Sequence, residues 1–453
     1  MTATFDRSRL RELVARERDG YAAANPISRA NFAAAEHLFG RVPMTWMAMW
    51  SGGFPLYLDR ARGCRVVDVD GHEYVDFALG DTGAMAGHSP PATVEAVARR
   101  IDERGGLTAM LPTDDGEWVA AELARRFGLP LWSFTLSATD ANRWAVRLAR
   151  LATGRPKLLT FAYCYHGTVD ETFALQGVDG RAVARPGNVG PPVPLDLTTR
   201  VAEFNDLDAV ERELAQGDVA AILAEPALTN IGIVLPEPGF LEGVRELATR
   251  HGALLMIDET HTFSAGPGGA TAAWDLEPDI LVIGKSIGGG IPCGAYGLTD
   301  DVAERVVTHA DADLEDVGGV GGTLAGNALS LAAMHATLEH VLTDEAFAHM
   351  IALAGRYTAG VQQTIDRTGL AWSVTQLGAR SEYRFAAPAP TSGTASASVA
   401  DDELDEYLHL ALANRGVLLT PFHNMALMCP DTTAVDVDRH TELFAEVVDA
   451  LVR

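Results

Sequence analysis

The sequence predicts an α/β fold in which helices cover both faces of a mostly parallel β-sheet. Between about residues 90 and 310, short apolar runs alternate with helical stretches, and the clearest runs are PKLLTFAY, DVAAILAEPAL, GALLMIDET and DILVIGKS. Continuous apolar runs separated by helices are typical of parallel strands buried on both faces. With 453 residues the chain is also long enough for a second domain.

The flanking regions predict a smaller α+β domain. Residues 1 to about 50 favour an amphipathic helix and then an irregular apolar segment at 42–50. In CRVVDVDGHEYVDFAL, two alternating runs are joined by Asp70-Gly71, which suits a type I′ turn and predicts a β-hairpin. Beyond residue 330, helices alternate with weaker strands around a low-complexity loop at 388–398. We therefore expect a large domain at 81–330 and a small domain built from 1–80 and 331–453.

Composition excludes several classes of function. A formal net charge of −26 argues against a nucleic-acid binder, which needs a basic face, and otherwise indicates a well-solvated surface. Cys64, Cys164, Cys293 and Cys429 lie far apart without metal-ligand spacing, so we expect reduced thiols and no metal. The N-terminus has no apolar signal region, and no apolar run is long enough to span a bilayer. These features predict a cytoplasmic protein.

Basic charge is carried almost entirely by arginine, because the chain has only two lysines, Lys157 and Lys285. Schiff-base chemistry requires a primary amine, which arginine cannot provide. If the protein uses such chemistry, the search is limited to these two side chains.

Reactive residues end three of the apolar runs, and the carboxyl ends of parallel strands are where α/β proteins place catalytic groups. These residues are Glu225, Asp258 with Glu259, and Lys285. Lys285 directly follows ILVIG and precedes SIGGG, which permits a sharp bend. A nucleotide P-loop does not fit, because Asp279 stands where that motif needs its first glycine. A solvated surface lysine is the alternative on position alone.

Two further features point toward a phosphate-bearing cofactor. Asp258 ends a buried strand, so it must be paired, solvated or functional, and a metal ligand or helix cap is the alternative. A carboxylate in that place can keep the pyridine nitrogen of pyridoxal 5′-phosphate (PLP) protonated. The segment 137–142 follows WSFTL and begins a helix, so it can bind phosphate or simply cap the helix.

Taken together, these segments resemble the class III, fold type I, PLP-dependent aminotransferases, especially the glutamate-1-semialdehyde aminomutases and the β- and ω-transaminases. The resemblance runs from about Asp68 to Asn327 and is most specific in EPALTNIGIVLPEPGFLEGVRELATRHGALLMIDET. It implies a large PLP-binding domain with a mostly parallel seven-stranded sheet, and a homodimer with shared sites. The main expectation is transamination, in which the amino group of an amine or amino acid donor is transferred to a 2-oxo acid.

The resemblance also implies roles for individual residues. Lys285 would form the covalent link to PLP and move the proton, and Asp258 would pair with the ring nitrogen. Tyr165 would stack on the ring beside His166, although core packing is the alternative. Thr323 would reach the phosphate of the neighbouring subunit. The expected cofactor-binding residues are Ser137, Ala138, Thr139, Tyr165, His166, Glu225, Asp258, Thr260, Lys285 and Thr323.

The chain departs from the family pattern at several positions. Where the family has Asn-Ser-Gly-Thr-Glu, this chain has residues 136–140 as LSATD, which lacks the glycine and the amide. Thr260, followed by His261, replaces a valine that packs under the ring, and its hydroxyl can adjust the ring or bond locally. Ala328 follows Asn327 in place of proline. None of these changes removes a group that the chemistry requires.

The reaction and the substrate remain open at this level. The aminomutase, or another PLP isomerase or racemase, is the alternative to transamination, but the segment 421–425 lacks the glutamate that aminomutases carry there. A PLP-fold protein without catalysis is a third possibility, and the presence of Lys285 and Asp258 argues against it. An arginine clamp would suit a carboxylate substrate, whereas an acidic side chain would disfavour one. The candidate substrate-binding residues, each also interpretable as core or surface, are Arg41, Trp46, Trp50, Asp81, Arg384 and His423.

Overall fold

The computed structural model describes residues 5–308 and 319–453, which form two compact units. Unit 1 comprises Met1–Ser89, Ala348–Ala389 and Val399–Arg453, and unit 2 comprises Pro90–Phe347 with Pro390–Ser398. The boundaries thus fall later in the chain than the expected positions near 80 and 330. Residues 1–4 and 309–318, which the expected domains include, lie outside the described residues.

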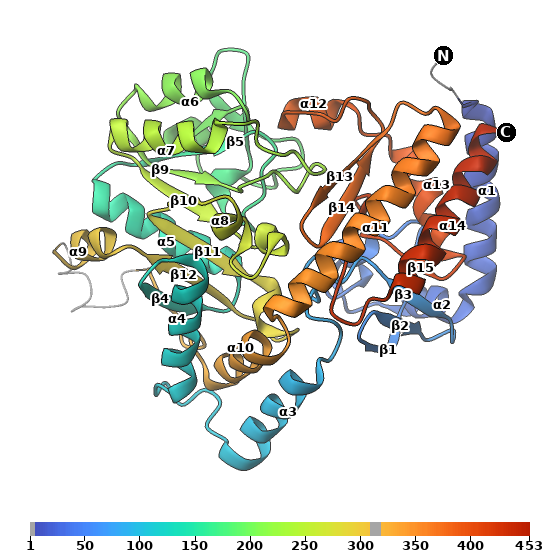
Figure 1. The fold of residues 1–453 in the computed structure, drawn as a ribbon, viewed down its shortest axis with the longest axis horizontal. Helices are drawn as coiled ribbons and strands as arrows, with labels where there is room; N and C mark the ends of the chain where they lie inside the picture. The colour runs from blue at the N-terminus through green and yellow to red at the C-terminus, as the bar shows by residue number, and fades with distance from the viewer. Residues whose placement is uncertain (1–4, 309–318) are drawn as a thin grey trace. The chain divides into compact units, whose positions relative to one another are not determined.

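Unit 2 is built on a seven-stranded sheet with the strand order β4-β12-β11-β10-β9-β5-β8 (Figure 1). Strand β12 is antiparallel to β11 and β4, and the other neighbouring pairs are parallel. The strands are β4 (Leu131–Thr135), β5 (Lys157–Phe161), β8 (Thr199–Ala202), β9 (Val219–Ala224), β10 (Leu254–Asp258), β11 (Ile280–Gly284) and β12 (Gly294–Leu298). The sequence-based expectation of a mostly parallel seven-stranded sheet is confirmed.

Helices cover this sheet on both faces, and alternate strand residues explain why. Leu159, Ile222 and Leu255 belong to a buried cluster with residues of α6 and α7, whereas their neighbours Leu158, Leu223 and Leu254 join a cluster with residues of α5. Successive strand side chains point to opposite faces, so a strand buried on both faces needs a continuous apolar run. The helices of unit 2 are α3 (Pro91–Arg99), α4 (Asp114–Phe127), α5 (Ala138–Thr153), α6 (Leu207–Leu214), α7 (Phe240–His251), α8 (Gly269–Ala273), α9 (Asp300–Thr308), α10 (Ala328–His340) and α12 (Gly393–Ser398). A small two-stranded sheet adds β6 (Ala174–Gln176) and β7 (Ala182–Ala184).

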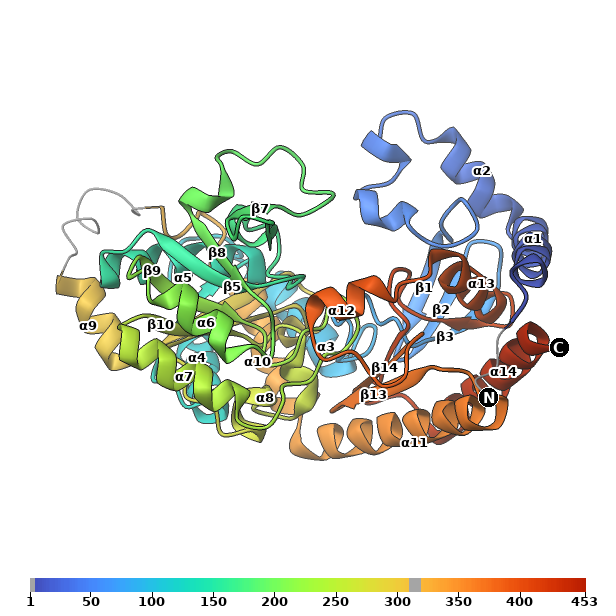
Figure 2. The same ribbon diagram turned by 90° about the horizontal axis from the view of Figure 1, so that it is seen from above.

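Unit 1 contains two small sheets, with strand orders β1-β2-β3-β15 and β13-β14-β16. Helices α11 and α14 lie side by side (Figure 2), joined by ion pairs from Arg356 to Asp438 and from Arg367 to Asp449. The strands are β1 (Leu58–Arg62), β2 (Arg65–Asp68), β3 (Glu73–Asp76), β13 (Ser373–Leu377), β14 (Arg380–Arg384), β15 (Val417–Leu418) and β16 (Met425–Leu427). The helices are α1 (Arg7–Ala24), α2 (Pro26–Ala34), α11 (Asp344–Thr368, which begins in unit 2), α13 (Asp402–Ala413) and α14 (Ala434–Val452).

Two local expectations need correction. The hairpin of β2 and β3 forms, but Asp70 does not adopt the positive φ that a type I′ turn requires. Its carboxylate instead accepts hydrogen bonds from the backbone of Ile27 and Ser28, at 2.7 and 2.9 Å. Tertiary hydrogen bonds therefore decide the form of this turn.

The segment 388–398 is not wholly a loop, because its second half forms helix α12 in unit 2. Ser396 donates a hydrogen bond to the carbonyl oxygen of Ile231, and Thr394 donates one to Glu203. Asn205 donates to the carbonyl oxygen of Thr391 at 2.8 Å. These contacts with distant parts of unit 2 hold a segment whose own composition gives no helical pattern.

Candidate active site

Three neighbouring parallel strands of unit 2 bring the predicted reactive residues to one edge of the sheet. Strands β9, β10 and β11 lie next to one another in register, with Ile257 opposite both Ala224 and Leu281. Glu225 therefore follows β9, Asp258 ends β10 and Lys285 follows β11 at the same carboxyl edge. This arrangement agrees with the expectation drawn from the strand ends.

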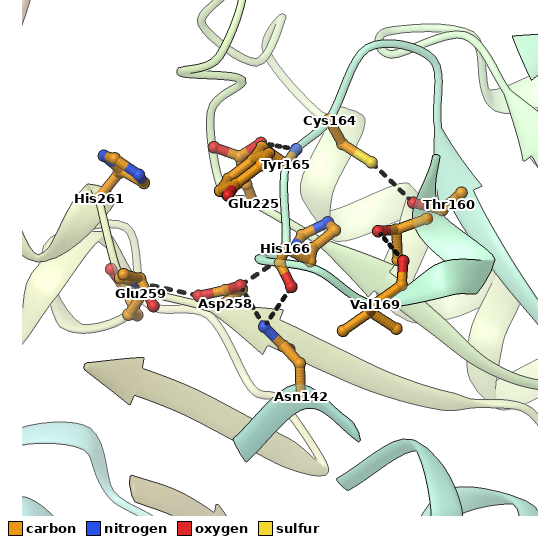
Figure 3. Close-up of polar contacts among 12 residues, drawn as sticks. Asn142, Thr160, Cys164, Tyr165, His166, Val169, Glu225, Asp258, Glu259 and His261 are labelled. Atoms are coloured by element: carbon orange, nitrogen blue, oxygen red, sulfur yellow. Dashed lines mark hydrogen bonds and ion pairs between the residues drawn. The ribbon is translucent and has the colours of Figure 1, made fainter. Parts of the chain in front are cut away.

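Asp258 is the centre of a buried hydrogen-bond network (Figure 3). Its side-chain oxygen Oδ2 lies 2.9 Å from Nδ1 of His166 and accepts a hydrogen bond from Nδ2 of Asn142 at 2.8 Å. The other oxygen, Oδ1, accepts from the backbone N–H of Thr260 at 3.0 Å. Asn142 also donates to the carbonyl oxygen of His166 at 3.3 Å, so one amide holds both partners of the pair.

This network keeps Asp258 ionised although it is only 3 % exposed. Burial alone would raise the pKa of Asp258, but the hydrogen bond and charge of His166 and the donors Thr260 and Asn142 lower it below its ordinary value. Burial would lower the pKa of His166, but nearby Cys164 and Asp258 together raise it well above the ordinary value. Both shifts favour the charged forms, a carboxylate beside an imidazolium.

Lys285 stands at a sharp bend directly after strand β11. It is the first residue of a short 3₁₀ helix, Lys285–Gly288, and has a positive φ of 54°, which is uncommon for a side chain of this size. Its amine nitrogen Nζ lies 2.8 Å from Nε2 of His261, which belongs to the turn after β10. His261 is 8 % exposed and Lys285 is half-buried, so the contact is partly buried.

The N-terminus of α5 provides a place for an anion at the same edge of the sheet. Ser137 caps this 16-residue helix by accepting a hydrogen bond from the N–H of Asp140, and Ala138 and Thr139 form its first turn. First-turn N–H groups have no partner within the helix, and the helix dipole favours negative charge there. Thr139 in turn accepts a hydrogen bond from the N–H of Thr168 at 3.2 Å.

Glycines allow two strands and a loop to approach this helix terminus closely. A Cβ atom on Gly284 would lie 2.9 Å from the backbone nitrogen of Ala138. One on Gly294 would lie 2.6 Å from the carbonyl group of Ser137, and one on Gly167 would lie 2.0 Å from Oγ1 of Thr139. These distances are shorter than Cβ contacts normally allow, so only glycine permits the observed packing.

Glu225 ties the loop that carries Tyr165 to the end of β9. One of its oxygens accepts a hydrogen bond from the N–H of Tyr165 at 3.1 Å, and the other accepts from the N–H and hydroxyl of Thr229. Figure 3 shows the Tyr165 ring beside Glu225. Burial raises the pKa of Glu225. Its observed contacts are with the protein backbone and a hydroxyl, which assigns it to the support of the loop.

These residues fit PLP by their chemistry. Lys285 has the primary amine that reacts with an aldehyde, and Asp258 is a charged carboxylate that can hold a proton on a pyridine nitrogen. The N-terminus of α5 offers N–H groups to a phosphate, at a point where glycines keep side chains away. Lys285, Asp258 and the segment 137–139 would thus hold the aldehyde end, the ring nitrogen and the phosphate.

Thr323 and the six candidate substrate-binding residues make none of the contacts described so far. Thr323 lies in unit 2 with an exposed side chain, and it takes no part in the contacts described above. All six candidate substrate-binding residues lie in unit 1. Within that unit, Trp46 packs edge-on against Phe422 with ring centroids 5.1 Å apart, and His423 lies 3.4 Å from the carboxylate of Glu382. Arg384 is buried, Arg41 is exposed, and Trp50 and Asp81 are half-buried.

Two residues of the site, Asn142 and His261, were not predicted to make the contacts that they make. Asn142 shares a buried helix face with Ala141 and Ala145, and a fully buried amide on such a face is a signal for a polar partner. His261 was noted only as a departure in sequence, because nothing in its position predicted a contact with Lys285. No cluster of three or more potential metal ligands occurs in the described ranges, and none of the described helices is long and apolar enough to cross a membrane.

Comparison with known proteins identifies the family. The model of the class-III aminotransferases matches residues 46–451. A glutamate-1-semialdehyde 2,1-aminomutase from Chloroflexus aggregans is 34% identical over 409 residues, covering 87% of this chain and 91% of that protein.

Two solved structures extend the comparison. A glutamate-1-semialdehyde aminomutase from Pseudomonas aeruginosa PAO1, in complex with PMP, has a TM-score of 0.96 and 48% identity over 99% of both chains. An ω-transaminase from Sphaerobacter thermophilus has a TM-score of 0.84 and 29% identity, covering 94% of this chain and 98% of that one. The chain therefore belongs to the class-III aminotransferase family of PLP-dependent enzymes, with fold type I.

Proposed function

We propose that this enzyme is an aminomutase that moves the amino group of glutamate-1-semialdehyde, or of a closely similar amino aldehyde, to the neighbouring carbon. The likeness to the Pseudomonas aeruginosa aminomutase, at 48% identity over 99% of both chains, carries this proposal. The curated relatives of the same name, such as the one at 34% identity, support it. The isomerase reaction thus takes precedence over the transamination that was the main expectation from the sequence.

The residues at the sheet edge would divide the work of this reaction. When bound, PLP and its amine form PMP supply an electron sink and carry the amino group. Asp258, kept charged by His166 and Asn142, would hold a proton on the ring nitrogen. The amine of Lys285 would take a proton from one carbon and return it to another, as a positioned base and acid. The first turn of α5 would bind the phosphate and fix the orientation of the ring.

The test is to supply glutamate-1-semialdehyde to the PMP-loaded enzyme without any 2-oxo acid. An aminomutase produces one molecule of the isomer, 5-amino-4-oxopentanoate, for each substrate consumed, over many turnovers. Quantification of both compounds by mass spectrometry gives this ratio, and the Lys285→Ala protein is the inactive control. Conversion that stops after about one turnover per site would reject the aminomutase.

Transamination is the second candidate, and the ω-transaminase at 29% identity favours it. A transaminase needs an amine or β-amino acid donor and consumes one 2-oxo acid, such as pyruvate or 2-oxoglutarate, for each donor. A panel of donors, each with and without an acceptor, separates the two reactions. Consumption of one 2-oxo acid for each donor converted, with no sustained turnover in its absence, would establish this second function.

The remaining expectations belong to the same proposal. A homodimer in which Thr323 reaches the partner's phosphate is consistent with its exposed side chain. Four buried cysteines without a disulfide are consistent with a cytoplasmic location. The unit 1 candidates for substrate binding are Arg41, Trp46, Trp50, Asp81, Arg384 and His423. Single alanine substitutions there should raise KM for the true substrate and leave PLP binding unchanged.

A further inference from the structure

Two basic side chains meet at the proposed reaction centre. The 2.8 Å distance between Nζ of Lys285 and Nε2 of His261 is that of a hydrogen bond. An ammonium group has no acceptor, and a doubly protonated imidazole has none either. The bond therefore requires that at least one of the two groups is unprotonated. A shared proton can lie on the lysine, with the imidazole as acceptor, or on the imidazole, with the amine as acceptor.

The carboxylates at the same edge of the sheet have hydrogen-bond partners of their own. These carboxylates are Glu225, which follows β9, Asp258, which ends β10, and Glu259, which follows it. The contacts of Asp258 go to His166, Asn142 and Thr260, as described above. Glu259 accepts from the hydroxyls of Thr262 and Thr271, both at 2.5 Å, and Glu225 binds the Tyr165 loop. Each carboxylate is thus committed to a different part of the framework.

We propose that His261 is the acid–base partner of Lys285 in the reaction proposed above, on which this inference rests. When Lys285 must act as a neutral amine, one N–H bond of its ammonium group breaks and an N–H bond forms at Nε2 of His261. The positive charge moves from the lysine to the imidazole, and no other bond changes. The reverse transfer restores the ammonium group when Lys285 must donate a proton.

A glutamine at this position separates proton exchange from simple positioning. His261→Gln retains a polar group that can accept a hydrogen bond from Lys285 but cannot take up its proton, whereas His261→Ala removes the contact. If His261 only held the lysine in place, glutamine would largely restore function. His340→Gln is the matched control, because His340 lies at the end of α10 with a side chain that is 57% exposed.

The first measurement needs no substrate turnover. The full-length protein is loaded with PMP, so that Lys285 is not covalently linked, and its lysines are labelled with ¹³C at the ε carbon. The chain has two lysines, so the spectrum has two lysine signals, and Lys157, which contacts Asp218 at 3.2 Å, is an internal reference. We expect the Lys285 signal to titrate in two steps, as a coupled pair does. The step at lower pH, here called the acid step, reports the titration of His261. It should disappear in His261→Gln and remain in His340→Gln.

The second measurement is turnover with whichever substrate the acceptor test identifies. We expect His261→Gln and His261→Ala to lower kcat about 100-fold each, at the lower end for loss of an acid–base group, with KM changed less than about threefold. Native turnover in His261→Gln, or a native Lys285 titration without the acid step, would overturn the proposal. The acid step could also disappear in His261→Gln while the native protein lacks aminomutase activity. That result would show that the Lys285–His261 pair exists and that the proposed function is wrong.

Discussion

At the scale of single residues, the buried pair of Asp258 and His166 determines the electrostatics of the site. Its position after a buried strand indicated that Asp258 must be paired, solvated or functional, and the family resemblance implied that it pairs with the ring nitrogen. It placed His166 beside the ring but gave no sign of their contact, because 92 positions separate them. Proximity of this kind depends on the order of β5 and β10 in the sheet.

The pair predicts a specific dependence of stability on pH. The raised pKa of His166 stabilises the fold fully below the unfolded value of about 6.5, and this contribution is lost as the pH rises toward the folded pKa. The lowered pKa of Asp258 stabilises the fold above about 3.9, and that contribution is lost as the pH falls below it. The pair should therefore contribute most between about pH 4 and 6.5.

Urea unfolding of the cofactor-free protein at several pH values tests this expectation. Above pH 6.5 or so, the native protein should lose up to about 1.4 kcal/mol of unfolding free energy per pH unit relative to His166→Asn, since one proton is released on unfolding. His72→Asn, at a side chain that is 43% exposed, is the control for loss of a histidine. Parallel pH curves for the native protein and His166→Asn would contradict a charged His166.

Asn142 makes a second prediction at this scale. Asn142→Ala removes a hydrogen bond to a buried carboxylate, so we expect a loss of about 1.5–3 kcal/mol in unfolding free energy. The control is Asn188→Ala, which removes a hydrogen bond to the neutral carbonyl group of Phe173 and should cost less. Differential scanning calorimetry compares the two variants. An equal effect would mean that the charge of Asp258 does not strengthen the contact.

At the scale of elements, the sequence was most informative where a strand is buried on both faces. The runs that became β5, β9, β10 and β11 were all recognisable, because a parallel strand between two helical layers has apolar residues at consecutive positions. Strand β12, with the sequence GAYGL, was not singled out, since two of its five residues are glycine. Those glycines are required by packing against β4 and the start of α5, which sequence periodicity does not reveal.

Gly294 therefore predicts a coupling between strand packing and cofactor affinity. Gly294→Ala would place a Cβ atom 2.5 Å from Oγ1 of Thr135 and 2.6 Å from the carbonyl of Ser137, so the helix terminus must shift. We expect a loss of about 1–3 kcal/mol in stability, as for overpacked cores, and weaker PLP binding measured by absorbance titration. Gly266→Ala, in extended backbone with no atom within 4 Å, should leave both unchanged. Equal PLP affinity in the two variants would contradict this account.

At the scale of the whole molecule, the small unit was only partly predictable. Its hairpin and helices were expected, but its boundaries near residues 89 and 348 were not. The helix at 393–398 belongs to the large unit because of hydrogen bonds from distant residues, which no local pattern encodes. The substrate candidates likewise came from the family resemblance and not from the pattern of residues. Their roles remain predictions.

The proposed shared sites can be tested with hybrid dimers. If Thr323 acts on the partner's phosphate, Lys285→Ala and Thr323→Ala subunits should combine into a dimer with one fully native site. Co-expression with two affinity tags isolates the hybrid, and the PLP titration should then reveal one site per dimer with native affinity. The Thr323→Ala homodimer should bind PLP about tenfold more weakly, the loss of roughly one hydrogen bond to a charged group. A hybrid without a native-affinity site would show that Thr323 does not act across subunits.

The division of the chain into two units has a consequence for how this enzyme can change. The hydrogen-bond network of Asp258, His166 and Asn142 lies entirely in unit 2, as do Glu225 and Lys285, whereas every candidate for substrate recognition lies in unit 1. If those candidates recognise the substrate, mutations that alter selectivity fall in a different compact unit from the buried charges. In evolution or in the laboratory, new substrates could then be sought by varying residues of unit 1 while the residues of the cofactor site are kept.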